Sequence, residues 1–350
     1  MKSFEPGFLE NHPISHSLLQ TIRLLGEFKG KEALFTLQAP QVLETLRQVA
    51  VIPSTESSNR IEGVEAPHDR IRKIVEQKTT PRNRSEQEIA GYRDVLATIH
   101  ANHANIPFTP GVVLQFHRDM YQFAPQEGGR WKPVDNQIIQ RDPGGGERVR
   151  FIPVAAYETA RAMEQLHERF GLAREAGKIE PLLLIAAYVL DFLCIHPFFD
   201  GNGRMARLLS LLQLYQTGYE VGRYISLEQV VENNREGYYD SLHASSQGWH
   251  EGRHSLEPWW EYFLGVMLVG AYREFERRTG ELTTARGAKS EMVLATIEKL
   301  PRQFRYTDLD MACPNISRAT IKRILKMLRD DNKLRCVKGG RNATYEKIGS

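Results

Sequence analysis

Residues 196–207 bring a base, a carboxylate, two glycines and two arginines into one short segment, His-Pro-Phe-Phe-Asp-Gly-Asn-Gly-Arg-Met-Ala-Arg. His196 is the group of this segment that accepts a proton near neutral pH. Asp200 offers a hard oxygen ligand for a Mg²⁺ ion that bridges phosphates. These residue types therefore predict chemistry on a phosphate compound.

The glycines and arginines of the segment predict an anion site. Gly201 and Gly203 flank Asn202, so that backbone N–H groups can converge on one point. A helix that starts near Arg204 adds the positive end of its dipole. Arg204 and Arg207 lie three positions apart on one helix face, and both guanidinium groups can reach the same phosphates.

Two other sites share parts of this pattern. A GxGxxA run starts at Gly201, but neither a strand nor a βαβ unit surrounds it, as a dinucleotide site requires. A calcium-binding EF-hand loop that began at Asp200 would need Gly and Glu where Met205 and Leu211 stand. The remaining alternative is a helix–turn–helix whose charged residues are incidental.

The elements on both sides of the segment can be read from the sequence. Residues 181–195 begin with proline and are apolar nearly all round, which predicts a buried central helix. Pro197 ends it, because the residue before a proline avoids the α conformation. A second helix is predicted over residues 204–216. Upstream, residues 130–139 and 148–152 alternate around a turn cluster at 142–146, which indicates a β-hairpin.

The rest of the chain predicts a mainly α protein in three parts: residues 1–105, 106–280 and 289–350. Further helices are predicted over residues 17–28, 40–51, 55–63, 85–103, 110–121, 155–170, 227–246 and 258–277. After a small, polar linker at 279–289, three helices (290–300, 307–312, 317–330) and a hairpin (334–338, 344–348) follow in the order of a winged helix.

Residues 196–207 are similar to the signature of Fic-domain proteins, HxFx(D/E)GNGRxxR, at every fixed position. The layout over about residues 107–245 resembles the Fic core. The N-terminal helices and the winged helix resemble the flanking domains of larger bacterial members. The resemblance implies a Fic-type helical core with a β-hairpin flap, an N-terminal helical region and a C-terminal winged helix.

The same resemblance implies an enzyme that transfers AMP from ATP to a Ser, Thr or Tyr hydroxyl of a target protein, with Mg²⁺ as cofactor. His196 would be the catalytic base, and Asp200 would hold the metal. Phosphotransferase relatives have Lys where Gly203 stands, so this glycine favours AMP transfer. The implied phosphate site is made of Gly201, Asn202, Gly203, Arg204 and Arg207.

Two further segments resemble Fic binding surfaces. The predicted hairpin resembles the flap that pairs with an extended stretch of the target, and its implied contacts are Ile138, Ile139, Arg150 and Phe151. Residues 233–239 resemble the lining of the adenine pocket, where Tyr238 and Tyr239 can stack on a base. A purely structural hairpin and tyrosines of the core are the alternatives.

Residues 58–63, Ser-Asn-Arg-Ile-Glu-Gly, resemble the inhibitory motif (S/T)xxxE(G/N) of many Fic proteins. The resemblance, carried by Ser58, Glu62 and Gly63, implies that Glu62 pairs with Arg207 and competes with the γ-phosphate of ATP. The alternative is a solvated helix face. Related proteins with this Glu also remove AMP from proteins, which is an alternative activity here.

Positive charge gathers at the C-terminal end. Residues 289–350 carry 14 basic and 7 acidic side chains, whereas the whole chain has a formal net charge of +3. A basic face on the predicted helix 317–330 and a basic wing suit contacts with DNA phosphates. The alternatives are protein contacts or a homodimer. A DNA-binding regulator whose core only senses nucleotide is thus the rival to an enzyme.

Cysteine usage and hydropathy bear on the compartment. The three cysteines form no CxxC pair and no even disulfide set, which favours a reducing environment. The first residues lack the apolar core of a signal sequence. The longest apolar stretch, residues 181–195, is too short for a membrane span and contains Asp191. We therefore expect a cytoplasmic protein with no membrane partner.

Overall fold

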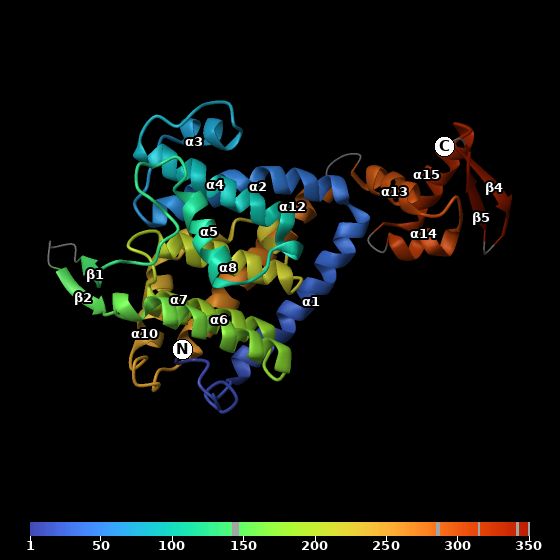
Figure 1. Cartoon of the computed structure of the whole chain (residues 1–350). Helices are drawn as coiled ribbons and strands as arrows, with labels where there is room; N and C mark the ends of the chain where they lie inside the picture. Colours follow the sequence, from blue (N-terminus) through green and yellow to red (C-terminus); the bar gives the residue numbers. More distant parts are fainter. Residues whose placement is uncertain (142–146, 285–287, 314–315, 341–342, 349–350) are drawn as a thin grey trace. The chain divides into compact units, whose positions relative to one another are not determined.

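The computed structural model describes residues 1–141, 147–284, 288–313, 316–340 and 343–348 of the chain. Helices make up most of this part, which confirms the mainly α class (Figure 1). The chain divides into two compact units, residues 1–26 with 49–272 and residues 27–48 with 273–350. The predicted division into three segments stays a prediction.

The first unit holds the segment 196–207. Its helices, including three that continue into the second unit, are α1 (His16–Gln38), α2 (Pro40–Ile61), α3 (His68–Val75), α4 (Arg84–Asn102), α5 (Pro110–Met120), α6 (Thr159–Ala176), α7 (Pro181–Ile195), α8 (Asn202–Gln216), α9 (Leu227–Asn233), α10 (Arg235–Ser246), α11 (Glu257–Trp260), the π-helical segment Glu261–Leu268 and α12 (Val269–Thr284). Short 3₁₀ turns lie at His103–Asn105, Ala156–Glu158 and Val221–Arg223.

Helix α7 is the centre of this unit, as its composition predicted. Nearly all of its side chains are buried, and it packs against α6, α8, α10 and α11 (Figure 1). Its one carboxylate, Asp191, is satisfied by hydrogen bonds from the Ser3 hydroxyl (2.6 Å) and the Trp249 indole N–H (2.6 Å). These donors explain how a carboxylate fits into an otherwise apolar helix, because a buried acceptor needs partners.

The predicted hairpin is present as strands β1 (Ile138–Arg141) and β2 (Glu147–Phe151). They pair antiparallel, with Ile138 opposite Phe151 and Ile139 opposite Val149, and a bulge between the two isoleucines. The predicted turn cluster at 142–146 lies outside the described residues. Figure 1 shows the hairpin next to α7 and α10, and β2 contacts α10.

Helix α2 differs from the sequence-based prediction. Residues 40–51 and 55–63 were expected as separate helices, but α2 is one helix from Pro40 to Ile61 that runs through Pro53. A proline inside a helix removes one backbone hydrogen bond. Because most residues of 54–59 are buried, we attribute the continuity to tertiary packing, which outweighs this loss.

Other boundaries also differ. Residues 227–246 form two helices, because Asn234 leaves the helical conformation (φ −129°, ψ 45°). The predicted linker at 279–289 is largely helical, since α12 continues to Thr284 and the next helix starts at Ala288. Helix α3 was not predicted, and it packs Ile71 and Ile74 against Ile89 of α4.

The second unit contains helices α13 (Ala288–Lys299), α14 (Tyr306–Ala312) and α15 (Arg318–Asp330) and strands β3 (Gln303–Arg305), β4 (Leu334–Lys338) and β5 (Thr344–Lys347). The strands form an antiparallel sheet in the order β3-β5-β4, of which β3 was not predicted. The unit has its own core, to which α15 contributes Ile321, Ile324, Leu325 and Leu328. Within the described residues, no helix combines the length and apolarity that a membrane crossing requires.

Candidate active site

His196 ends helix α7 in an unusual backbone conformation. Its φ of 50° and ψ of 61° lie in the left-handed region, and its N–H donates to the Phe192 carbonyl at 2.9 Å. A non-glycine residue in this region costs free energy, so surrounding contacts must hold it. The turn redirects the chain into the loop that leads to α8.

Asn202 fixes that loop. Its side-chain oxygen accepts the Phe198 N–H at 2.9 Å, and its amide donates to the Phe198 carbonyl at 2.8 Å. Gly201, which precedes α8, has a φ of +81°, a value that glycine adopts without strain. The Asn202 side chain therefore stabilises the loop through these two hydrogen bonds, in addition to its predicted place in the phosphate site.

The first turn of α8 holds a carboxylate. A Cβ placed on Gly203 would lie 2.1 Å from Oε1 of Glu62 and 3.3 Å from the Arg207 guanidinium. Only glycine leaves room for this close approach. The carboxylate group thus sits at the N-terminal turn of a helix, where backbone N–H groups favour an anion.

Arg207 is held by the end of α2. Its Nε donates to the Ser58 hydroxyl at 2.8 Å, and one terminal nitrogen donates to the Ser58 carbonyl (2.8 Å) and to Glu62 (2.8 Å). The Arg207 side chain is 6% exposed and that of Glu62 is 28% exposed. The residues that the resemblance singled out, Ser58, Glu62 and Arg207, are therefore in direct contact.

Arg204 points elsewhere. Its guanidinium group is fully buried and forms an ion pair with Glu88 at 2.7 Å. It also donates to the Tyr121 hydroxyl at 2.8 Å and to the Asn59 side chain at 3.3 Å. In this structure Arg204 joins α8 to α2, α4 and the residue after α5, and its predicted phosphate contact stays a prediction.

Asp200 lies in the loop between α7 and α8. Its side chain is 53% exposed, and Oδ1 accepts the Gly201 N–H at 2.7 Å. Arg84 lies 3.6 Å from Oδ2. An exposed carboxylate oxygen of this kind can serve as a metal ligand.

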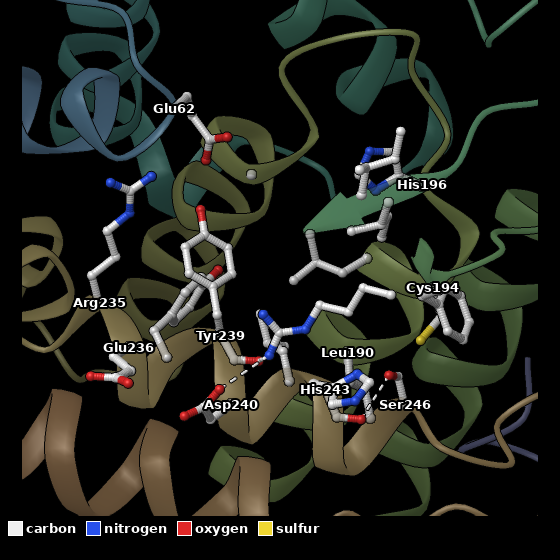
Figure 2. A pocket seen from close by; sticks show the side chains of 18 residues that line it. Glu62, Leu190, Cys194, His196, Arg235, Glu236, Tyr239, Asp240, His243 and Ser246 are labelled. Carbon is white, nitrogen blue, oxygen red and sulfur yellow. Dashed lines mark hydrogen bonds and ion pairs between the residues drawn. The ribbon is translucent and has the colours of Figure 1, made fainter. Parts of the chain in front are cut away.

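A cavity of about 780 Å³ lies between α7, α10 and the hairpin. Figure 2 shows Glu62 at the upper left and His196 at the upper right, with Tyr239 of α10 below Glu62 and Cys194 below His196. Gly203 also borders the cavity. His196, Glu62 and the first turn of α8 therefore border the same cavity.

The tyrosines of α10 take different positions. Tyr238 is buried among Trp259 and Tyr262, at ring-centroid distances of 5.6 and 5.7 Å, as a core residue would be. Both tyrosines border the cavity, but Tyr239 is less buried than Tyr238, and the guanidinium of Arg235 lies 5.7 Å from the Tyr239 ring centroid. Tyr239 is thus the better placed of the two for contact with a ligand.

The hairpin borders the same cavity. All four predicted flap contacts, Ile138, Ile139, Arg150 and Phe151, line it. Arg150 donates to the Tyr239 carbonyl at 2.5 Å and lies 3.3 Å from Asp240. Phe151 stacks on His250 at a centroid distance of 5.3 Å. Arg150 thus links the hairpin to α10, and Phe151 links it to the segment that follows α10.

The imidazole of His196 is neutral at physiological pH. Burial, and next the positive charge of Lys132, lower the pKa of His196 to about 4. A neutral imidazole has a free lone pair and can accept a proton.

The Fic/DOC family model matches residues 107–214, which contain the hairpin, α7, the loop and most of α8. Residues 107–214 of the chain are therefore similar to the Fic/DOC family. The match covers the elements that border the cavity on the side of His196, whereas Glu62 and α10 lie outside it.

Relatives of known name are distant from this chain in sequence. A Fido domain-containing protein of Dictyostelium discoideum is 29% identical over 119 residues, 34% of this chain and 77% of its own. Protein adenylyltransferase Fic of Nematostella vectensis is 26% identical over 199 residues, 55% of this chain. The match spans only 42% of the length of that adenylyltransferase.

A solved Fic family protein from Desulfovibrio desulfuricans has the same fold. It is 21% identical, with a TM-score of 0.63, and the alignment covers 97% of this chain and 98% of that one. The predicted Fic-type helical fold is thereby confirmed.

Several residues of the site were missed by sequence reasoning. Glu88 pairs with Arg204, and Arg235 donates to the Ile61 carbonyl at the end of α2, at 2.8 Å. His117 accepts the Gly129 N–H at Nδ1 (2.9 Å), so that its other nitrogen donates to the Asp200 carbonyl (3.1 Å). The Lys132 ammonium group donates to the carbonyl of Ile195, the last residue of α7. None of them lies in the motif, and no local pattern pointed to them.

Proposed function

We propose that this chain transfers AMP from ATP to a Ser, Thr or Tyr hydroxyl of a target protein. The observation that carries the proposal is the carboxylate of Glu62, an anion held at the first turn of α8 beside Arg207. A site that holds one anion there can hold a phosphate group. The name of the Nematostella relative, a protein adenylyltransferase, supports the same reaction.

The proposed chemistry is an in-line displacement. The target hydroxyl oxygen attacks the α-phosphorus, the bond from that phosphorus to the bridging oxygen of the β-phosphate breaks, and pyrophosphate leaves. His196 accepts the hydroxyl proton at its imidazole. Positioning of the reactants and neutralisation of charge would supply most of the rate.

Mg²⁺ is the proposed cofactor, with Asp200 as its protein ligand. When bound it would neutralise charge on the phosphates. The half-exposed Asp200 carboxylate offers a hard oxygen at the mouth of the loop. Among the described residues no three His, Cys, Asp or Glu side chains are grouped to hold a metal. This donor set suits an ion that shares its ligands with ATP.

The hairpin is the proposed docking strand for the target. Ile139 and Val149, which are paired across β1 and β2, are 48% and 47% exposed. An extended segment can add to the edge of such a hairpin through main-chain hydrogen bonds, which would bring its hydroxyl near His196.

Glu62 is the proposed brake on this activity. Its carboxylate occupies the turn of α8 and engages Arg207, the arginine proposed to bind the γ-phosphate. ATP must then either displace Glu62 or bind in an unproductive pose. Removal of AMP from proteins is the alternative use of the same carboxylate, and it is an outcome of the test below.

A second function is favoured by α15 of the second unit. Its apolar residues are buried, whereas Lys322 and Lys326 are exposed on the opposite face, near Arg318 and Arg329. We propose that this unit is a winged helix and binds duplex DNA through phosphate contacts.

Labelled ATP tests the proposed reaction. The purified chain is incubated with ATP labelled at the α- or the γ-phosphate, with and without cell lysate. Wild type should transfer label from the α-phosphate only, and His196→Ala should transfer none while it still binds ATP. His16→Ala, a change at an exposed histidine, is the matched control. Label from the γ-phosphate alone would mean kinase chemistry and contradict the proposal, whereas loss of AMP from a pre-modified target would favour the removal activity.

A further inference from the structure

The segment between α5 and the hairpin carries a lysine that is 3% exposed, Lys132. Its backbone N–H donates to the Pro197 carbonyl at 2.8 Å, and its side-chain Nζ donates to the Ile195 carbonyl at 3.1 Å. These two carbonyls belong to the residues on either side of His196. Lys132 thus forms hydrogen bonds to the backbone on both sides of His196, whose conformation is left-handed.

The same lysine reaches the root of the hairpin. Nζ also donates to Oδ1 of Asn136 at 2.9 Å, and the Asn136 amide donates to the Phe198 carbonyl at 3.2 Å. Strand β1 begins at Ile138, two residues after Asn136. The loop after His196 and the hairpin root are therefore joined through Lys132 and Asn136, and the Phe198 carbonyl accepts from both Asn136 and Asn202.

Lys132 is also a buried cation. Burial lowers the pKa of its ammonium group to about 8, although Asp135 acts in the opposite direction. The group therefore remains mostly protonated at neutral pH. Its hydrogen bonds go to a carbonyl and an amide oxygen, so they do not cancel its charge.

We propose that Lys132 is a positioning residue for the transfer reaction, which holds the His196 turn in its left-handed conformation and fixes the base relative to the hairpin. This role rests on the proposed AMP transfer. It assigns Lys132 to the geometry and charge of the base, whereas nothing places it against ATP or the metal.

Two parts of the role can be separated physically. The hydrogen bonds supply geometry, and displacement of a reacting group by about 1 Å costs roughly a hundredfold in rate. The positive charge disfavours the imidazolium form of His196, while Glu62 and Asp200 favour it. Loss of the Lys132 charge removes the second cause of the lowered pKa of His196 while burial remains, so this pKa should rise toward its ordinary value.

Three substitutions test the two parts. Lys132→Met removes the donor and the charge, Lys132→Gln keeps a donor without the charge, and Lys132→Arg keeps both. Asn136→Ala breaks the link to the hairpin but leaves the cation in place. Each is made in wild type and with Glu62→Gln, so that transfer is measured with and without the proposed brake.

The expected result is a loss in kcat of about ten- to a hundredfold for Lys132→Met, with the KM for ATP within about twofold of wild type. Lys132→Arg should restore most of the rate. In nuclear magnetic resonance titrations the pKa of the His196 imidazole should rise in the Met and Gln variants and stay unchanged in the Arg and Asn136→Ala variants. The acid limb of the kcat/KM profile should move with it to higher pH.

A folded Lys132→Met or Lys132→Gln variant whose imidazole titrates as in wild type would overturn the proposal, and so would one with wild-type kcat. If neither wild type nor Glu62→Gln transfers AMP, the proposed function fails. The imidazole titration then still decides whether Lys132 acts on His196. If Lys132→Met does not fold, the Gln and Arg variants carry the same comparison.

Discussion

Three groups from the last turns of α2 converge on one guanidinium. The Ser58 hydroxyl, the Ser58 carbonyl and the Glu62 carboxylate all accept hydrogen bonds from Arg207, each at 2.8 Å. Arg207 is thus held by neutral acceptors as well as by an opposite charge. Glu62 can leave without stripping Arg207 of all its partners, which suits a reversible contact.

Glu62→Gln and Glu62→Gly should both raise AMP transfer, including transfer onto the protein itself. A charge-assisted hydrogen bond of about 2–3 kcal/mol corresponds to a rate effect of about 30- to 150-fold. Incorporation of α-labelled ATP at equal folded concentration measures it. The exposed neighbour Glu65→Gln is the matched control. If both Glu62 variants transfer no more than this control, Glu62 is not a brake.

Asn202→Ala should lower the free energy of unfolding by about 2 kcal/mol, because it leaves the buried Phe198 N–H without its acceptor. The Phe198 carbonyl keeps the Asn136 amide as a donor. Urea denaturation measures the change. Asn11→Ala, which removes an exposed hydrogen bond to Gly7, is the control and should change little. Equal stability of the two variants would mean that Asn202 does not stabilise the loop.

Among the elements, the hairpin depends on α10 for its position. Arg150 of β2 donates to the Tyr239 carbonyl and faces Asp240, so one side chain bridges the two elements. The Arg150 guanidinium also lies 5.9 Å from the Tyr239 ring centroid. Contacts of this kind can keep a two-stranded hairpin ordered, since an isolated hairpin is only marginally stable.

Arg150→Ala should loosen the hairpin. Loss of a net hydrogen bond of about 1–1.5 kcal/mol predicts faster amide hydrogen exchange in β2, by about five- to tenfold. Mass spectrometry of the exchange over residues 147–152 measures it. Arg148→Ala, at the neighbouring alternate position of the same strand, is the control, since it leaves the bridge to α10 intact. An unchanged exchange rate in Arg150→Ala would mean that the contacts of Arg150 with α10 do not keep the hairpin ordered.

At the scale of the whole molecule, the two units differ in what they expose. The first unit encloses the cavity and the Fic signature. The second has its own apolar core and a basic helix, α15, and within the described residues its fold does not depend on the cavity. This division fits one unit for the transfer reaction and another for a partner.

The full chain should therefore bind duplex DNA, with an affinity that falls steeply as salt rises. Lys322→Glu with Lys326→Glu should weaken binding and reduce the slope of log Kd against log salt by about two. The control pair, Lys73→Glu with Lys178→Glu, makes the same charge change on exposed residues of the first unit. Electrophoretic mobility shifts at several salt concentrations measure the affinity for duplex DNA and its dependence on salt. Absence of binding at low salt would favour a protein contact or a homodimer.

The sequence alone determined the features that depend on local physics. Glycines on both sides of Asn202, a proline after His196 and a nearly all-apolar helix each specify backbone geometry through their own residues. The hairpin and the buried α7 followed from side-chain periodicity in the same way. These features were sufficient to predict the loop between α7 and α8 and to indicate the similarity to Fic proteins.

The tertiary structure alone decided which distant groups meet. Arg204 and Arg207 are equivalent by spacing, but in the folded chain Glu88 of α4 pairs with the first and Glu62, which follows α2, pairs with the second. Tertiary packing also decides that α2 continues through Pro53. It likewise brings Lys132 into hydrogen-bond contact with the backbone on both sides of His196. Such pairings join residues 60 to 150 positions apart, and only the packing of helices brings them within hydrogen-bond distance.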